Sequence, residues 1–158
     1  MNNVIISQNR HWDNSYKNLC DRDIFQKLIK NLNSKHIQVL HGIRRSGKSS
    51  LFKLMINHLS ENIDPQEILY INLDDPFFTK YSNDPTSFYE IIQAAKKLTQ
   101  KEIKYLFLDE VQAIYGWEKY IKSVYDSNVF KKIFITGSNS TLLSGEFAML
   151  LTGRYIST

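Results

Sequence analysis

Residues 42–49 read Gly-Ile-Arg-Arg-Ser-Gly-Lys-Ser, and this stretch decides the fold. It matches G-x-x-x-x-G-K-[ST], the pattern of a phosphate-binding loop (P-loop) between a strand and a helix. Its glycines let backbone N–H groups approach phosphate oxygens, and the following helix directs its positive dipole end at the same anion. The predicted phosphate-binding residues are Gly42, Ile43, Arg44, Arg45, Ser46, Gly47, Lys48, Ser49 and Ser50.

Two residues of this loop have specific expected roles. The Lys48 ammonium would reach the β and γ phosphates, and the Ser49 hydroxyl would bind magnesium. The flanking sequence agrees with the assignment, because residues 36–40 are short and partly β-branched, as in a strand. After the loop, apolar residues recur at the spacing of one helix face: Leu51, Leu54, Met55 and Leu59.

Length and composition limit the class of protein. A chain of 158 residues, 23% charged and 42% hydrophobic, suits one soluble globular domain with a proper core. A single cysteine, Cys20, excludes a disulfide framework. Without a signal-peptide pattern at the N-terminus or an apolar run long enough for a membrane span, the chain is predicted to be cytoplasmic.

The net charge of +4 raises the question of nucleic acid. Basic pairs such as Lys96-Lys97 and Lys131-Lys132 could contact nucleic acid, but solvated surface lysines are the preferred interpretation. The charge therefore leaves a protein or nucleic-acid partner unassigned.

Apolar strands alternate with amphipathic helices along the chain. Residues 1–20 are polar and are predicted to form a lead-in with little regular structure, and residues 21–158 to form the core domain. This alternation predicts an α/β fold with a doubly wound, mostly parallel sheet between two layers of helices. The predicted strands are 36–40, 68–73, 103–108, 132–136 and a fifth starting near 153, and the predicted helices are 21–32, the segment after the loop, the segment after Pro85, 117–125 and 140–151.

Polar residues follow the predicted strands, at the edge of the sheet where ligands bind in such folds. Asp109 ends an apolar strand, as in a Walker B motif, and its carboxylate would hold magnesium, commonly through water. Glu110 would orient and deprotonate the attacking water. The alternative for this pair is that it only caps the next helix. Asp74 and Asp75 could join a magnesium network or start the turn at Pro76.

Two further residues are candidates for catalysis. Ser138 follows the fourth strand and could sense the γ-phosphate or position water, with Thr136 and Asn139 as rivals and a simple turn as the alternative. Arg154 could supply positive charge to the transition state, in cis or from a neighbouring subunit, or form a surface salt bridge.

Several motifs occur in a fixed order along residues 20–158. They are Gly42–Ser49, Tyr-Ile-Asn-Leu-Asp-Asp-Pro from Tyr70, Leu-Asp-Glu-Val-Gln from Leu108, Gly-Trp-Glu from Gly116, Ile-Thr-Gly-Ser-Asn-Ser from Ile135, and Leu-Leu-Thr-Gly-Arg from Leu150. Together they resemble a family of AAA+-type P-loop ATPases of bacteria and archaea. The resemblance implies ATP as nucleotide, magnesium as cofactor and the strand order 5-1-4-3-2. It places Lys48 and Ser49 in Walker A and Asp109 and Glu110 in Walker B, whereas Gln112, Ser138 and Arg154 match pattern positions with less certain roles.

The expected function is magnesium-dependent ATP binding and hydrolysis that drives conformational change in an attached or partner module, with self-association possible. The alternative is a nucleotide-gated binding module with little turnover. Members of the resembled family continue past Thr-Gly-Arg-Tyr into a larger C-terminal domain, whereas this sequence ends at Thr158. The helical lid is therefore expected to be absent, and turnover by this chain is expected to be weak.

Overall fold

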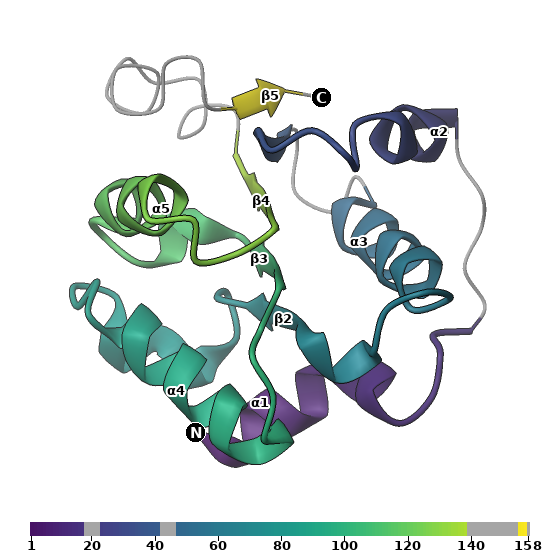
Figure 1. The fold of residues 1–158 in the computed structure, drawn as a ribbon. Coiled ribbons are helices and arrows are strands. Elements are labelled where there is room, and N and C mark those ends of the chain that lie inside the picture. The colour runs from purple at the N-terminus through teal and green to yellow at the C-terminus, as the bar shows by residue number, and fades with distance from the viewer. Residues whose placement is uncertain (18–22, 42–46, 139–154, 158) are drawn as a thin grey trace.

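The computed structural model describes residues 1–17, 23–41, 47–138 and 155–157, drawn in colour in Figure 1. Its α-helices are α1 (Asn2–Gln8), α2 (Asp23–Lys30), α3 (Lys48–Leu59), α4 (Ser87–Thr99) and α5 (Trp117–Asp126). Short 3₁₀ helices are η1 (Arg10–Trp12), η2 (Pro65–Glu67), η3 (Pro76–Tyr81) and η4 (Val111–Ala113). The strands are β1 (Ile37–His41), β2 (Ile68–Asn72), β3 (Tyr105–Asp109), β4 (Lys132–Gly137) and β5 (Tyr155–Ser157). The helix predicted at 140–151 lies outside the described residues.

The five strands form one parallel sheet in the order β2-β3-β4-β1-β5. This order is the predicted 5-1-4-3-2, so the predicted fold class is confirmed. In the register, Asn72 lies opposite Asp109, and Leu40 lies opposite Thr136. The carboxyl ends of β2, β3, β4 and β1 therefore meet at one edge of the sheet, where ligands bind in open parallel sheets.

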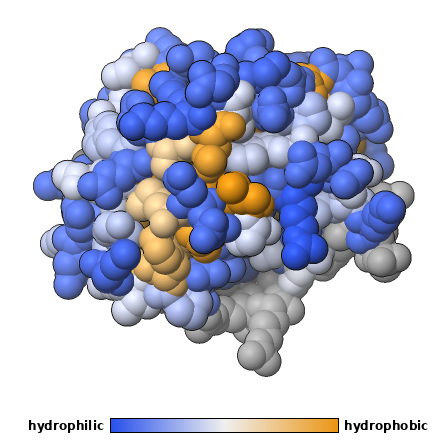
Figure 2. Space-filling view, turned by 90° about the horizontal axis from the view of Figure 1, so that it is seen from below, coloured by the Kyte–Doolittle hydropathy of each residue, from blue (hydrophilic) through white to orange (hydrophobic). Residues whose placement is uncertain are grey.

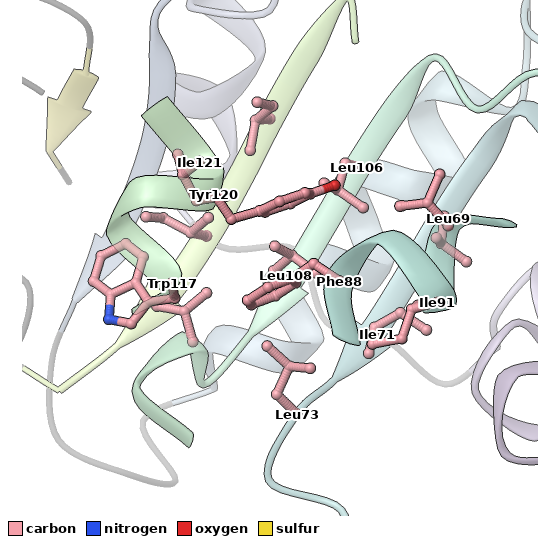
Figure 3. Close-up of a cluster of buried hydrophobic side chains, with 14 of the residues drawn as sticks. Leu69, Ile71, Leu73, Phe88, Ile91, Leu106, Leu108, Trp117, Tyr120 and Ile121 are labelled. Atoms are coloured by element: carbon pink, nitrogen blue, oxygen red, sulfur yellow. The ribbon is translucent and has the colours of Figure 1, made fainter. Parts of the chain in front are cut away.

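Helices cover both faces of the sheet, with α4 and α5 on one side and α2 and α3 on the other (Figure 1). Each face of the sheet has its own hydrophobic core. Figure 3 shows the core under α4 and α5, in which Phe88 and Ile91 of α4 and Tyr120 of α5 meet aliphatic side chains of β2 and β3. The aromatic rings of Phe88 and Tyr120 stack with centroids 4.6 Å apart. The sequence predicts one apolar face for each of these helices. The predicted residues of α4 (Phe88, Ile91, Ile92 and Ala95) are all buried. Of those predicted for α5, Trp117, Tyr120, Ile121 and Val124 are buried, and Tyr125 is partly buried against the same core.

The opposite core contains a cluster of phenylalanines between α3 and the sheet. Phe107 and Phe134 stack with centroids 4.2 Å apart, and Phe52 meets Phe107 edge-on at 5.1 Å. Of the face predicted for α3, Leu51, Met55 and Leu59 are buried and Leu54 is partly buried. Phe52 and Ile56 lie outside the predicted face and are fully buried, so the buried surface of α3 is wider than predicted. The reason is that α3 packs against α2 as well as the sheet, so more than one stripe of its surface is covered.

The N-terminal segment corrects one sequence prediction. Little regular structure was expected over residues 1–20, but α1 and η1 form there, and Ile5 of α1 is fully buried. The segment lies along the outer edge of β2, the strand at one end of the sheet. Polar composition was misleading because these polar side chains bond the sheet rather than water. The predicted division into a lead-in and a core stays a prediction.

Four side chains of this segment form an edge clamp, which we define as Gln8, Asn9, His11 and Trp12. The Gln8 amide donates to the Asn72 carbonyl and accepts from its N–H, at 3.2 and 3.0 Å. The Asn9 amide makes the same pair of bonds with Tyr70, at 2.8 and 2.7 Å. His11 and Trp12 both hydrogen-bond the Ile68 carbonyl, at 2.8 and 2.9 Å. The clamp thus does with side chains what a sixth strand would do with its backbone.

One lysine of the two basic pairs is buried and not on the surface. Lys132 is only 2% exposed, and its ammonium donates to the carbonyls of Ser34 and His36 at 2.8 and 2.5 Å. It is therefore not a surface lysine, and burial lowers its pKa to about 8. Lys96 is partly exposed and pairs with Glu102 at 3.0 Å.

Seen from below, the molecule is mostly hydrophilic, with a narrow apolar strip (Figure 2). Among the described residues, large hydrophobic side chains that are exposed include Ile6, Tyr89, Tyr115 and Val129. None of the helices in the described part of the chain is both long and apolar enough to span a membrane.

Candidate functional site

The site begins at the N-terminus of α3, beside the carboxyl ends of the strands. Gly47 caps the helix with φ of +87°, a left-handed conformation that glycine adopts without steric cost. The chain then enters the first turn of α3 with Lys48 and Ser49. This turn presents backbone N–H groups and the positive end of the helix dipole, the features that bind a phosphate anion.

Asp109, at the end of β3, lies at the centre of a hydroxyl cluster. It is 1% exposed, and its Oδ2 accepts from the Ser49 hydroxyl and from the Tyr70 hydroxyl, each at 2.5 Å. Its Oδ1 accepts from the Thr136 hydroxyl. These three hydroxyls come from α3, β2 and β4, so three separate elements hold one carboxylate in place.

Tyr70 is a permanent donor in this cluster. Burial, and secondarily the Asp109 carboxylate, raise the pKa of Tyr70 well above its usual range. The phenol therefore keeps its proton at any physiological pH. Tyr70 was treated in the sequence only as part of an apolar strand, and the available signal was one tyrosine in an aliphatic run, since a buried phenol needs a hydrogen-bond partner.

Glu110 follows with an unusual backbone. Its φ and ψ are both 57°, in the left-handed region that non-glycine residues seldom occupy, and its N–H donates to the Thr136 hydroxyl at 2.9 Å. Such conformations persist where the surrounding structure holds them, and they cluster at active sites. This turn carries the Glu110 carboxylate toward α3 instead of letting β3 continue.

Both oxygens of the Glu110 carboxylate have protein partners. Oε1 lies 3.5 Å from the Lys48 ammonium, and Oε2 accepts from the Gln112 amide at 2.5 Å. Lys48 also donates to the Gly137 carbonyl at 3.0 Å. Lys48 is 7% exposed and the Glu110 side chain 13%, so this ion pair is largely screened from water.

The donor set around Asp109 fits magnesium. Carboxylate and hydroxyl oxygens are hard ligands of the kind Mg²⁺ prefers. Among the described residues there is no group of three or more His, Cys, Asp or Glu side chains that could hold a metal. The residues that would hold a magnesium ion here are Ser49 and Asp109.

The structure brings together Lys48, Ser49, Asp109 and Glu110 as predicted from the sequence. Ser138 directly follows β4 and is partly buried. Asp75 caps η3 by accepting from the Phe77 N–H at 2.9 Å. This contact agrees with the alternative in which Asp75 starts the turn at Pro76. The remaining predicted site residues lie outside the described residues or contribute no described contact here: Gly42, Ile43, Arg44, Arg45, Ser46, Asn139 and Arg154 are outside, and Ser50 is exposed in the first turn of α3.

The comparisons with known proteins agree with this geometry. A family model described as an AAA domain matches residues 34–158. An uncharacterized protein of Haemophilus influenzae is 39% identical over 132 residues, covering 83% of this chain and 32% of that protein. The uncharacterized protein MJ1544 of Methanocaldococcus jannaschii is 37% identical over 139 residues, covering 87% of this chain and 28% of that protein.

Among solved structures, that of C. elegans PCH-2 is similar with a TM-score of 0.56 and 16% sequence identity, covering 96% of this chain and 45% of that one. At this identity the likeness supports the fold alone. The chain spans about a third of the length of the curated relatives it matches.

Proposed function

The chain belongs to the AAA domain family, which indicates a P-loop nucleotide-binding domain, and we propose that it binds ATP with magnesium and hydrolyses it. One observation carries the proposal: Lys48 and Ser49 at the start of α3 meet Asp109 and Glu110 at the end of β3. A cation for phosphate, oxygen ligands for a metal and a carboxylate for water are thereby held within one cluster.

Each group has a distinct task in this proposal. Residues 42–50 would enclose the phosphates, and the Lys48 ammonium would offset charge on the β and γ phosphates. Ser49 and Asp109 would hold magnesium, and the ion would supply positive charge against the negative charge that develops on the phosphates. Tyr70 and Thr136 would keep the Asp109 carboxylate turned toward Ser49.

Glu110 would act on the attacking water. As the water oxygen bonds to the γ-phosphorus, the bond to the ADP oxygen breaks and the water proton passes to the Glu110 carboxylate. Ser138, next to the end of β4, would contact the γ-phosphate. Arg154 would supply positive charge to the transition state, from this chain or from a neighbouring copy.

The output of the cycle would be a conformational change passed to an attached or partner module. This part of the proposal rests on family membership and on the greater length of the relatives. Self-association is included because an arginine acting from a neighbouring subunit requires it.

Phosphate release tests the proposal. The wild type is expected to release phosphate from ATP only with magnesium, and Glu110→Gln is expected to bind ATP normally while losing about 100-fold in rate. Lys48→Ala, by contrast, is expected to lose ATP binding. Equal and slow phosphate release by the wild type and Glu110→Gln, with ATP bound by both, would contradict hydrolysis.

A second candidate function has one observation in its favour. Both oxygens of Glu110 are engaged by protein groups, Lys48 and Gln112, which is a resting arrangement for a catalytic base. The chain could then act as a nucleotide-gated binding module with little turnover. The same assay separates the two functions, since such a module binds ATP but shows no loss of rate in Glu110→Gln.

A further inference from the structure

Only one of the two polar atoms of the Gln112 side-chain amide has a hydrogen-bond partner among the described residues. Gln112 lies in η4, and its Nε2 donates to Oε2 of Glu110 at 2.5 Å. Its Oε1 is buried without a hydrogen-bond partner among the described residues. We propose that Gln112 is a positioning residue that holds the Glu110 carboxylate and the attacking water together. This inference rests on the proposed hydrolysis of ATP.

The first step of the argument concerns Lys48, the other partner of Glu110. Its ammonium lies 3.5 Å from Oε1 of Glu110. A triphosphate bound at α3 carries more negative charge than a carboxylate and competes for the same ammonium. Once Lys48 contacts the phosphates, its hold on Glu110 weakens. Gln112 is then the side chain, among the described residues, that still bonds the carboxylate.

The second step concerns the backbone of Glu110. Glu110, in the left-handed conformation, is the one residue between the end of β3 and the start of η4. Glu110 and Gln112 are thus separated by one residue, yet their side chains meet. The turn holds the two polar groups at a fixed separation, so the amide restricts the carboxylate as phosphates enter the site.

The third step concerns the free oxygen. A buried acceptor without a partner costs free energy, and most such atoms in proteins are bonded by protein or water. A water next to Glu110 can donate one hydrogen to the carboxylate and the other to Oε1 of Gln112. Both lone pairs of the water oxygen are then unused, and one of them can attack phosphorus. The proton still passes to Glu110, and Gln112 neither gains nor loses one.

The test uses Gln112→Met, which keeps the length of the side chain but has no amide. Gln93→Met is the matched control, because Gln93 is exposed on α4. We expect Gln112→Met to lower kcat about 100-fold. The KM for ATP and the Kd for a slowly hydrolysed analogue, ATPγS, should stay within about twofold of wild type, since the proposed role of Gln112 is toward Glu110 and water and not toward the phosphates.

A second measurement, the affinity for a transition-state mimic, tests whether Gln112 positions the water and needs no turnover. ADP with aluminium fluoride mimics the planar phosphoryl group and its attacking water, so its extra affinity over ADP alone should fall about 100-fold in Gln112→Met. Gln112→Glu keeps acceptor oxygens but places a carboxylate against Glu110, and it should be equally impaired. This variant keeps the size and polarity of the site if the methionine variant fails to fold.

Three outcomes overturn the inference. Wild-type kcat and wild-type aluminium fluoride affinity in Gln112→Met would show that neither base nor water depends on the amide. Parallel losses of ATPγS affinity and thermal stability would show a structural role. A wild type that binds ATP but releases no phosphate would overturn the proposed function itself, and the inference with it.

Discussion

Two buried polar regions of this protein differ in how completely their hydrogen bonds are satisfied. At the outer edge of β2, the clamp residues bond the backbone of Ile68, Tyr70 and Asn72, and every clamp bond is between neutral groups. At the end of β3, two consecutive residues, Asp109 and Glu110, carry carboxylates, and the backbone of Glu110 is in the left-handed conformation. There, Oε1 of Gln112 is buried without a described partner.

The difference indicates that the clamp contributes to stability, whereas the cluster at the end of β3 is suited to chemistry. A satisfied neutral network stabilises the fold and seals a sheet edge that would otherwise pair with another chain. Strain and an unsatisfied acceptor persist only where the surrounding structure holds them and a ligand can use them. Tyr70 belongs to both regions, since Asn9 binds its backbone and Asp109 accepts from its hydroxyl.

The largest expected effect comes from breaking the clamp. Asn9→Ala leaves the N–H and carbonyl of Tyr70 buried without partners, and we expect the free energy of unfolding to fall by about 4 kcal/mol. Urea denaturation measures this, with Asn3→Ala, an exposed residue of the preceding helix α1, as a control. The folded Asn9 variant should keep nucleotide affinity within about twofold. If Asn9→Ala were as stable as the wild type but could not bind nucleotide, the clamp would serve the site and not the stability of the fold.

Acid should weaken the clamp through His11. Burial lowers the pKa of His11 from 6.5 to about 4, although the Ile68 carbonyl acts against this shift. Between these values the unfolded chain binds more protons than the folded protein, so stability falls as pH decreases from 6.5 to about 4. The loss is about 3 kcal/mol.

The measurement for His11 compares urea midpoints near pH 7 and pH 4 in the wild type and in His11→Gln. Since carboxylates titrate in both proteins, the difference between them isolates the imidazole. We expect the variant to show a weaker dependence on pH over this window. Identical pH dependences would mean that His11 does not contribute to acid unfolding.

A smaller effect is expected from Tyr70→Phe, which tests the boundary between the regions. The ring still packs edge-on against Phe52, but Asp109 loses one of its three hydroxyl donors. We expect magnesium-dependent ADP affinity to fall about tenfold with a change of about 1 kcal/mol in unfolding free energy. Calorimetric titration with and without magnesium measures it, and Tyr105→Phe at the opposite end of β3 is the control. Unchanged magnesium dependence would confine the Tyr70 hydroxyl to a structural role.

The smallest effect is expected where a polar contact is exposed to solvent. Lys122 and Asp126 pair at 2.8 Å on α5, with 39% and 38% of their side chains exposed. Lys122→Ala should change the free energy of unfolding by about 0.3 kcal/mol. Thermal unfolding at low and high salt measures this change. A loss comparable to that of Asn9→Ala would show that burial is not what distinguishes the clamp.

The predicted fold followed from local patterns. Apolar strands between amphipathic helices predicted the parallel sheet. The buried faces of α4 and α5 could be predicted because their apolar residues recur at helical spacing. The face of α3 was underestimated because burial by two neighbours leaves no simple period. The helices of the N-terminal segment were missed because polar side chains that bond a sheet edge resemble those that face water.

The sequence by itself determined the alternation of strands and helices after the N-terminal segment and the two acidic residues at the end of an apolar strand, because each is a property of neighbouring residues. The phosphate loop stays a prediction, since residues 42–46 lie outside the described part of the chain. Only the tertiary structure decided which groups surround Asp109 and Glu110. Tyr70 and Ser49 are distant from Asp109 in the chain and reach it only through the parallel register and the placement of α3. The same packing turned Gln112 from a pattern position into the amide that holds Glu110, since a hydrogen bond depends on position in space.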